Sequence, residues 1–554
     1  SPYFKNYELY YGVSYNPESW QKINLENNEY QIVNENIHIF DLTNLIDTVY
    51  TIRLLVNTID NNTFEERSSF IIDRTVPVII SHSLFSAMLN DIETVQASII
   101  TNENVTAQLF YRTQNSDENF KSLYLDGFSQ DVKVVSKKHF GILPISEVLT
   151  EVNHEFYFEV TNQAGLKTIL KDGANYFKSE NVIENNIQNR DFNDLSLPAG
   201  RIFPQTVIFA GFNSNFILLN ENTTSADLSI YDIQNQNFTK MNSLKNRIPV
   251  SVGDFNNDGK TDILNLFVQR GFIETQKSVG SLEFETVFSD TSGNFWPALA
   301  ENIDDDSNTE IIVFSSDTTI AVWEVQSDFN LTLESELKIF SSGENQTGKS
   351  IFRNNQVVVG DFDNDNKNEI VAADNFGRLI VYEIANNNSF KNDFIVETFY
   401  TIESNTLISK GDFNSDGILD IGIISQFENN EFITPLIYTS VFTFKENKSE
   451  ILFQTMLITT ENKFIRSFEK SYSAINFADL NNDSKDELII FSNPNAYVFE
   501  NDLDKAKLIF YQTNVNTQSI LAGDLDGNQI PEIAIPDGDS FRFIEFQSNG
   551  NLRT

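Results

Sequence analysis

From residue 250 onward the chain repeats one pattern of positions: a short apolar run, an acidic loop and a second apolar run. The loop copies start at Asp254, Asn302, Asp361, Asp412, Asp479 and Asp524. Their spacings are 48, 59, 51, 67 and 45 residues, with a mean of 54. Repeats of about 40–50 residues are typical of β-propellers, in which each blade is a four-stranded sheet. The pattern therefore predicts an all-β fold with one blade for each copy.

The residues that follow each loop are apolar and rich in β-branched side chains, as expected for buried strands. These runs are Ile263–Leu266, Ile311–Phe314, Ile370–Ala373, Ile421–Ile424, Leu488–Phe491 and Ile533–Ile535. Alternating strands such as Ile320–Val325 and Leu379–Ile384 follow most of them. Residues 177–250 have no acidic loop but carry corresponding runs at Thr206–Asn213 and Leu228–Ile233. Seven repeats fit into the remaining chain, so we predict a seven-bladed propeller over residues 177–554.

Each acidic loop has oxygen-bearing side chains at its positions 1, 3, 5 and 9. Alternate residues of a tight loop point inward, and Ca²⁺ takes about six to eight oxygen ligands, including backbone carbonyls. The predicted ligands are Asp254, Asn256, Asp258 and Asp262; Asn302, Asp304, Asp306 and Glu310; Asp361, Asp363, Asp365 and Glu369; Asp412, Asn414, Asp416 and Asp420; Asp479, Asn481, Asp483 and Glu487; and Asp524, Asp526, Asn528 and Glu532. An EF-hand would instead place its last acid at position 12, between helices.

Asp, Asn and Gly also form ordinary turns, and that reading would suffice for a single copy. Six copies in one register favour a metal, because carboxylates this close repel one another without a cation. We therefore predict up to six structural Ca²⁺ ions. The Asp361 loop has four carboxylates and should bind most tightly, whereas the loops at Asn302 and Asp524 should bind more weakly. At position 6, Gly259, Asn366 and Gly417 suit a left-handed backbone better than Ser307, Ser484 and Gln529 do.

The six loops resemble FG-GAP/VCBS-type repeats, the calcium-loop blades of integrin-α-like propellers. The resemblance covers residues 177–554. It implies that calcium is structural, fixing a hairpin in each blade, and that the propeller is a platform for adhesion or ligand binding. The chain departs from that pattern in its loopless first blade and at Asn302.

Residues 1–176 lack the repeat and consist of short predicted strands separated by turn residues. The segments that carry a second resemblance are Phe4–Gly12, Pro17, Trp20, Tyr50–Leu54 and Ile72–Pro77. They are similar to fibronectin-III/Ig-like modules of large secreted bacterial proteins, some of which are subtilisin-like proteases. We expect one β-sandwich over 1–77, without its first strand, and a second over 78–176. The polar segment 178–200 should link them to the propeller.

Composition excludes several partners. Lys and Arg number 38 against 79 Asp and Glu, a net charge of −41. Nucleic acids and anionic membranes bind positively charged surfaces, so neither is expected as a partner. The absence of Cys excludes disulfides and thiolate metal sites. No apolar run is long enough to span a bilayer, so no membrane insertion is expected. An acidic, calcium-binding chain of this kind is expected outside the cell or on its surface.

No catalytic motif is found in the sequence. The four histidines, His38, His82, His139 and His154, lie away from the acidic loops. There is no G-x-S-x-G, no glycine-rich phosphate loop and no H-E-x-x-H. Carboxylates bound to calcium are poor proton carriers. We therefore expect no enzyme, and we expect Trp323 to be a core residue rather than a sugar-stacking one.

The expected function is a non-catalytic adhesion or interaction protein whose propeller presents a rigid face to a protein or glycan, alone or in a larger surface assembly. The alternative is the C-terminal accessory region of a secreted subtilisin-like protease or carbohydrate-active enzyme whose catalytic domain lies outside this chain. A propeller hydrolase or lyase is a third, weaker hypothesis. The sequence leaves the ligand, the binding face and the oligomeric state open.

Overall fold

The computed structural model describes residues 3–545 except 18, 26, 34, 90–91, 126–134, 143–152, 179–182, 186–193, 197–206, 211–215, 221–226, 235–236, 268–269, 291, 293–294, 305, 317–318, 339–355, 375–377, 387–388, 398–404, 428–435, 446–447, 458–472, 493–494, 503–504, 514–519, 524–530 and 538–539. These residues form strands and turns without an α-helix, as predicted. Among them no helix is long and apolar enough to cross a membrane.

The C-terminal part of the described chain contains seven four-stranded antiparallel sheets, each built from strands that follow one another in sequence, apart from one strand of the last sheet. The first three are β14–β17 (Val207–Ala210, Phe216–Asn220, Leu228–Gln234, Asn237–Leu244), β18–β21 (Ile248–Gly253, Asp262–Phe267, Arg270–Gln276, Phe284–Ser289) and β22–β25 (Trp296–Glu301, Thr309–Ser316, Thr319–Val325, Leu331–Lys338). The next three are β26–β29 (Val357–Gly360, Glu369–Ala373, Arg378–Asn386, Ser389–Glu397), β30–β33 (Asn405–Gly411, Asp420–Phe427, Leu436–Lys445, Lys448–Leu457) and β34–β37 (Ser473–Ala478, Glu487–Ser492, Asn495–Asp502, Lys505–Thr513). The last comprises β38–β40 (Leu521–Gly523, Glu532–Asp537, Ser540–Glu545) and β13 (Asp194–Ser196).

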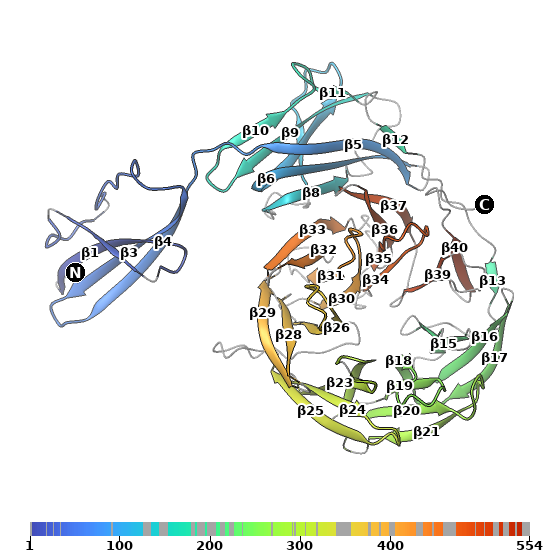
Figure 1. Cartoon of the computed structure of the whole chain (residues 1–554). Coiled ribbons are helices and arrows are strands. Elements are labelled where there is room, and N and C mark those ends of the chain that lie inside the picture. Colours follow the sequence, from blue (N-terminus) through green and yellow to red (C-terminus); the bar gives the residue numbers. More distant parts are fainter. Residues whose placement is uncertain are drawn as a thin grey trace.

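The seven sheets follow one another around a ring (Figure 1). The last sheet is completed by a strand that precedes the first sheet in sequence, because β13 pairs antiparallel with β40. Pairing covers the open edge of β40 and ties the two ends of the ring together. The segment 178–200, expected to be a linker, therefore also contributes a strand to the ring.

The strands in the middle of each sheet are buried on both faces, which explains their continuous apolar sequences. All five residues of the middle strand β27 are buried, and so are all four residues of β26, the first strand of the same sheet. The cores lie between neighbouring sheets. One of them joins Ile312 and Phe314 of the β22–β25 sheet to Val357 and Ile370 of the next. Stacking of sheet on sheet is therefore the main source of apolar burial in the ring.

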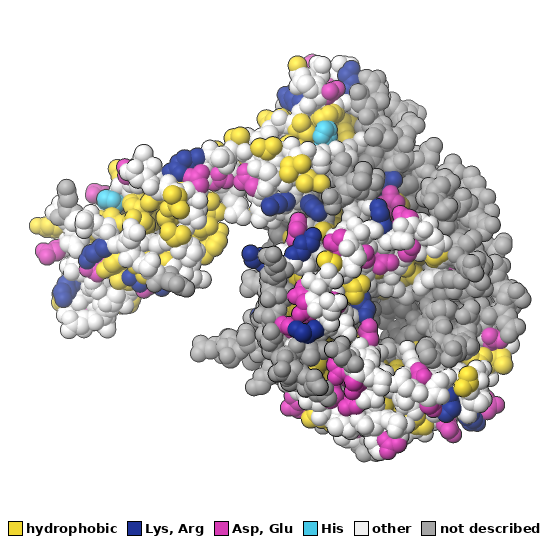
Figure 2. Space-filling view, in the orientation of Figure 1, with side chains coloured by type: hydrophobic (Ala, Val, Ile, Leu, Met, Phe, Trp, Pro, Cys, Tyr) yellow, Lys and Arg dark blue, Asp and Glu magenta, His cyan; other side chains and the backbone are white. Residues whose placement is uncertain are grey.

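The N-terminal residues form one four-stranded sheet in the order β2-β1-β3-β4 (Gln21–Ile23, Phe4–Val13, Thr48–Thr58, Thr63–Ile72), set apart from the ring (Figure 1). Hydrophobic side chains lie on the surface of this part of the molecule (Figure 2). Tyr30, Ile39 and Phe64 are 72%, 84% and 63% exposed. The described residues provide one sheet here, and the sandwich expected for 1–77 stays a prediction.

A second N-terminal sheet contains eight strands: β5 (Ile79–Leu89), β6 (Ile92–Thr113), β7 (Lys121–Tyr124), β8 (Ser136–Ile142), β9 (His154–Asn162), β10 (Lys167–Leu170), β11 (Phe177–Lys178) and β12 (Ile183–Asn185). The long strand β6 pairs with β5 and β8 along its first half and with β7 and β9 along its second. Its register against β8 shifts between Ile100 and Val105, where the ladder passes from one set of partners to the other.

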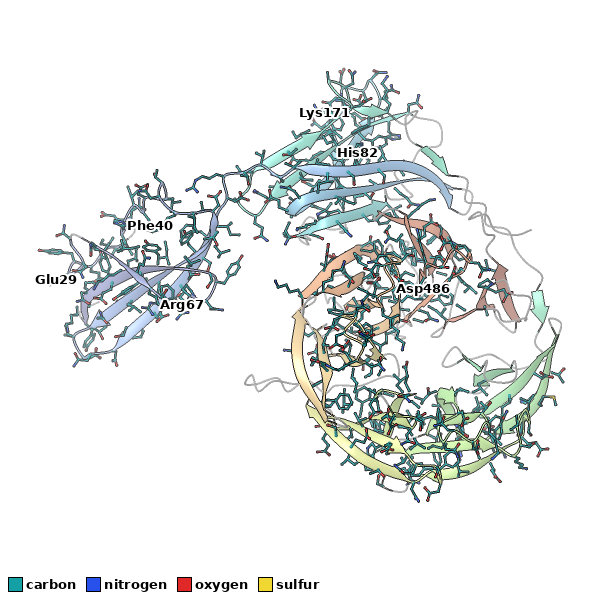
Figure 3. The ribbon with its side chains drawn as sticks, in the orientation of Figure 1. Glu29, Phe40, Arg67, His82, Lys171 and Asp486 are labelled. Atoms are coloured by element: carbon teal, nitrogen blue, oxygen red, sulfur yellow. The ribbon has the colours of Figure 1, made fainter. Side chains whose placement is uncertain are left out.

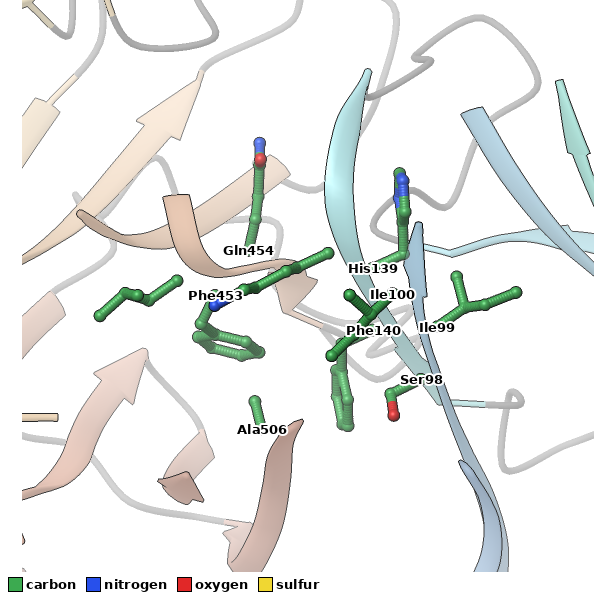
Figure 4. A pocket seen from close by; sticks show the side chains of 10 residues that line it. Ser98, Ile99, Ile100, His139, Phe140, Phe453, Gln454 and Ala506 are labelled. Carbon is green, nitrogen blue, oxygen red and sulfur yellow. The ribbon is translucent and has the colours of Figure 1, made fainter. Parts of the chain in front are cut away.

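This second sheet packs directly on the ring. Phe140 of β8 is 2% exposed, and its ring centroid lies 5.7 Å from that of Phe453 and 5.9 Å from that of Phe499. The buried side chain of Gln96 donates to Leu508 O at 3.2 Å and accepts from Leu508 N at 3.1 Å. Figure 4 shows the two sides of this contact, with a pocket between them that His139 and Gln454 also line. The second sheet thus contributes Phe140 to a core of the ring and has a second core of its own around Phe158.

Candidate metal centre

The acidic loops join the first and second strands of their sheets, so that position 9 is the first residue of the second strand or, for Glu310, its second residue. The residues at position 9 are all buried, between 0% and 4% exposed: Asp262, Glu310, Glu369, Asp420, Glu487 and Glu532. Carboxylates are rarely buried this completely unless they are paired or bind a metal. Sequence spacing predicts a ligand at this position, and the structure adds that the carboxyl group there is buried.

In the five loops whose starts the structure describes, one oxygen of the acid at position 9, the closing acid, fixes the loop. Asp262 Oδ2 accepts a hydrogen bond from Phe255 N at 2.8 Å, and Glu369 Oε2 accepts one from Phe362 N at 2.8 Å. The corresponding bonds to Ile303 N, Phe413 N and Leu480 N are 2.6, 2.9 and 2.7 Å long. The side chain at position 2 is apolar and buried in every one of these loops. Apolar anchor and closing acid therefore hold the loop start against the strand.

The acid at position 1 shapes the loop from inside. Asp361 accepts from Asp365 N at 3.1 Å with one carboxylate oxygen and from Asn366 N at 3.0 Å with the other. The same two bonds are made by Asp254, Asp412 and Asp479. The backbone is left-handed at positions 4 and 6 of these four loops: Asn257 and Gly259, Asn364 and Asn366, Ser415 and Gly417, and Asn482 and Ser484. Ser484, expected to suit this conformation less well, adopts it at φ 67°.

Two loops bring three carboxylates together. Single carboxylate oxygens of Asp304, Asp306 and Glu310 lie within 4.8 Å of one another, and so do those of Asp361, Asp363 and Glu369. The second oxygen, Oε1, of both Glu310 and Glu369 is buried and has no hydrogen-bond donor. A buried anion without a donor is costly, and a cation among the three carboxylates would supply the missing partner. The residues present therefore fit a metal ion with oxygen ligands.

The raised pKa values of the closing acids also favour a bound cation. Burial, together with the charges of nearby loop carboxylates, raises the pKa of Glu369 and of Glu487 to about 8. Burial likewise raises the pKa of Asp262 to about 6 and those of Glu310 and Asp420 to about 7. Desolvation and like charges both disfavour the ionised form. Without a cation, these sites would hold protons near neutral pH.

The two loops expected to be weak differ from the others. The amide of Asn302 donates from Nδ2 to Asp306 O at 2.7 Å, so its nitrogen ties the loop together instead of facing a metal. In the last loop, Asp524, Asp526 and Asn528 lie outside the described residues, and only Glu532 can be placed. The ligand prediction for that loop stays untested.

The strand next to each closing acid supplies a partner that the loop motif did not predict. Thr275 stands directly opposite Asp262, and Thr443 follows Phe442, the partner of Ile421, on the strand beside Asp420. Glutamates stand opposite two of the closing glutamates, in the pairs Glu310 with Glu324 and Glu369 with Glu383, and the charge of Glu500 acts on Glu487. Because hairpin length varies, the number of residues between these partners is not constant. The strand register is therefore needed to identify the pairs.

Neighbouring loops also contact one another. Asn368 at position 8 of one loop donates to Ile303 O of the preceding loop at 3.1 Å. Asp486, at position 8 of its own loop, accepts from Asp412 N at 2.8 Å, while its backbone N donates to Asp412 O at 3.1 Å (Figure 3). Asp486 thus links its own loop to the first acid, Asp412, of the loop before it.

The histidines take no part in these sites. His139 is buried, with Nε2 2.8 Å from Ser136 O, and His82 lies against Phe158 and Phe177. His154 lies against Phe156, and His38 is exposed. Trp323, expected in the core, is half-buried against the cluster that includes Phe295. Packing thus accounts for His82, His139 and His154.

A family model for the FG-GAP-like repeat matches residues 361–423, a stretch that holds the Asp361 and Asp412 loops. A search of curated proteins finds no match to the sequence. Among solved structures, the chain is similar to BBS1N in complex with ARL6DN, with a TM-score of 0.41, 10% identity and coverage of 66% of this chain and 98% of that one. It is also similar to rhamnogalacturonan lyase YesW, with a TM-score of 0.36, 10% identity and coverage of 83% and 88%. At these TM-scores neither similarity carries a conclusion about this chain.

Proposed function

We propose that residues 177–554 form a seven-bladed, calcium-stabilised β-propeller that serves as a non-catalytic platform for binding a protein or glycan outside the cell or on its surface. The seven four-stranded sheets would be its blades, with β13 closing the last one. The two N-terminal sheets would belong to Ig/FnIII-like sandwich modules. The FG-GAP-like match at residues 361–423 supports a propeller-type interaction domain.

The observation that carries the proposal is the environment of Glu369. Its side chain is 4% exposed, its Oε2 holds the loop start, and its Oε1 has no donor while carboxylate oxygens of Asp361 and Asp363 lie nearby. A turn without a metal would gain nothing from this arrangement, because the same fold could use a neutral side chain there. A cation would compensate the three charges at once.

Calcium is the cation that this set of ligands favours. Every predicted side-chain ligand offers an oxygen, and carboxylate and amide oxygens are what Ca²⁺ binds, whereas zinc sites use His and Cys. The loops are also irregular in composition, with Asp or Asn at position 3 and Asp or Glu at position 9. Ca²⁺ tolerates such variation better than Mg²⁺, which demands near-octahedral geometry.

The way in which these carboxylates are used supports a non-catalytic role. Position 1 and position 9 acids accept backbone hydrogen bonds that hold the loop, and metal binding would occupy lone pairs that these bonds leave free. Such groups are poor general acids or bases because their protons and lone pairs are already committed. The rigid ring would instead present the loops between its strands to a partner.

Equilibrium dialysis followed by metal analysis tests the proposal. We expect several equivalents of calcium per chain, and fewer after Glu369→Gln, which keeps the shape of the side chain and removes its charge. Glu336→Gln, at an exposed position on β25, is the matched control and should leave the count unchanged. Absence of bound calcium in the wild-type protein at millimolar free calcium would overturn the proposal.

A further inference from the structure

The β22–β25 sheet carries carboxylates that lie outside its loop motif. Glu324 of β24 stands directly opposite Glu310, the closing acid of the loop. Glu334 of β25 falls at the register shift between Val322 and Trp323, beside Glu324. Burial raises the pKa of Glu334, and the charges of Glu310, Glu324 and Asp304 raise it further. Together with Asp304 and Asp306, five carboxylates of this sheet act on one another.

In the neighbouring β26–β29 sheet, a lysine lies between the corresponding loop and strand carboxylates. There, Lys367 Nζ lies 3.1 Å from Asp365 Oδ2 and 3.1 Å from Glu383 Oε1, so that a positive charge sits between loop and strand. In the β22–β25 sheet the corresponding residue is Asn308. Its Nδ2 donates to Asp306 Oδ2 at 3.1 Å and to Glu324 Oε1, in the same two directions. The geometry is kept, but a neutral amide replaces the cation.

A second observation points to a ligand at this place. Glu310 is 1% exposed, and its Oε1 is buried without a hydrogen-bond donor while oxygens of Asp304 and Asp306 lie within 4.8 Å. Like charges directly opposite one another on a sheet are destabilising. The facing pair Glu310 and Glu324, with Glu334 behind it, therefore requires compensation that Asn308 cannot provide.

We propose that Glu324 and Glu334 complete a cation site on the β22–β25 sheet, together with Asp304, Asp306 and Glu310. The two glutamates would replace the carboxylate that is missing at Asn302 and give the site an affinity for hard cations no lower than that of the Asp361 loop. This inference rests on the proposed function, in which the loops bind calcium. It reverses the order of affinity that the loop sequences predict.

Two of the three tryptophans, Trp296 and Trp323, lie on this same sheet, and the third, Trp20, lies in the N-terminal part of the chain before β3. Tb³⁺ binds to calcium sites, and its emission after tryptophan excitation reports mainly the ions nearest a tryptophan. When the full chain is titrated with Tb³⁺ and the tryptophan-sensitised emission is recorded, the signal should therefore come mainly from the β22–β25 site. Competition with Ca²⁺ in the same experiment gives its calcium affinity.

We expect the double variant Glu324→Gln/Glu334→Gln to need about tenfold more Tb³⁺ or Ca²⁺ for half-saturation, since two charges next to the ion are lost. The single variant Glu334→Gln should show a smaller shift in the same direction. Glu383→Gln, the same change at the corresponding position of the β26–β29 sheet, is the control and should leave this titration unchanged. A double variant that titrates like the wild type would overturn the inference.

Thermal melting separates a metal ligand from a merely structural residue. In excess EDTA the double variant should be at least as stable as the wild type, because repulsion between carboxylates is removed. In calcium its rise in melting temperature should be smaller. Lower stability in EDTA would assign the glutamates a structural role and overturn the inference. A wild-type protein that shows neither Tb³⁺ emission nor a calcium shift would overturn the proposed function itself.

Discussion

The ring makes two kinds of stabilising contact, and they differ in chemistry. At the acidic loops, buried carboxylates such as Glu369 and Asp420 face other carboxylates. At the contact with the second N-terminal sheet, the apolar Phe140 and the neutral Gln96 are buried, and Gln96 uses both its amide oxygen and its amide nitrogen on Leu508. Neutral, fully paired groups stabilise under any conditions, whereas buried like charges stabilise only when a cation or protons compensate them.

The largest difference between the two regions should appear when calcium is removed. Ligand binding to the folded state alone adds about 2.7 kcal/mol per site when calcium exceeds the dissociation constant a hundredfold. Several loops together should therefore raise the melting temperature in millimolar calcium far above that in excess EDTA. Differential scanning calorimetry measures the shift, with Mg²⁺ as the control ion, from which we expect a smaller effect. Equal melting temperatures in calcium and EDTA would contradict this.

The next effect is a dependence on pH that is confined to the loops. The folded pKa values of Glu369 and Glu487 are raised from 4.5 to about 8, so the metal-free folded state binds protons that the unfolded state has already released. Stability in EDTA should therefore fall as pH rises from about 4.5 to about 8 and level off above that. Because calcium competes with these protons, its stabilising effect should grow over the same range.

Urea unfolding at several pH values, with and without calcium, measures both trends. A double variant Glu369→Gln/Glu487→Gln is the control, since it should flatten the dependence in EDTA. Stability in EDTA that increases between pH 5 and 8 would contradict the expected sign.

The contact with the second N-terminal sheet is broken most strongly by Phe140→Ala. Truncating a buried phenylalanine in a shared core should cost about 3–5 kcal/mol. The cost should be the same in calcium and in EDTA, because no ion takes part. Phe110→Ala, which removes a half-buried ring stacked on Tyr157 of the same sheet, is the control and should cost less. Urea unfolding measures both. If the cost of Phe140→Ala depended on calcium, the contact and the loops would not be energetically independent.

The smallest expected effect comes from Gln96→Leu. The substitution keeps the volume of the side chain but leaves the buried N–H and C=O of Leu508 without the amide that now pairs with them. Buried polar groups that lose their partner cost about 1–3 kcal/mol. Gln108→Leu, at a half-buried position of the same strand, is the control. Equal stability of Gln96→Leu and the wild type would show that water replaces the lost contacts.

The sequence by itself determined the repeated units of the ring and the positions of the acidic loops. Each apolar run after a loop is part of an observed strand, for example Ile370–Ala373 in β27 and Ile421–Ile424 in β31. These are local features, since strand alternation and turn residues act within a few positions of the chain. The same holds for the left-handed position 6, where Gly259 and Asn366 met the expectation.

Only the tertiary structure decided which distant residues meet. The pairing of β13 with β40, the contact of Phe140 with Phe453 and the position of Glu324 opposite Glu310 each join segments at varying separations. Hairpin lengths and strand registers set these contacts, and neither leaves a fixed spacing in the sequence. The burial of the closing acids, which makes their charge costly and a cation favourable, likewise depends on sheets that stack from other parts of the chain.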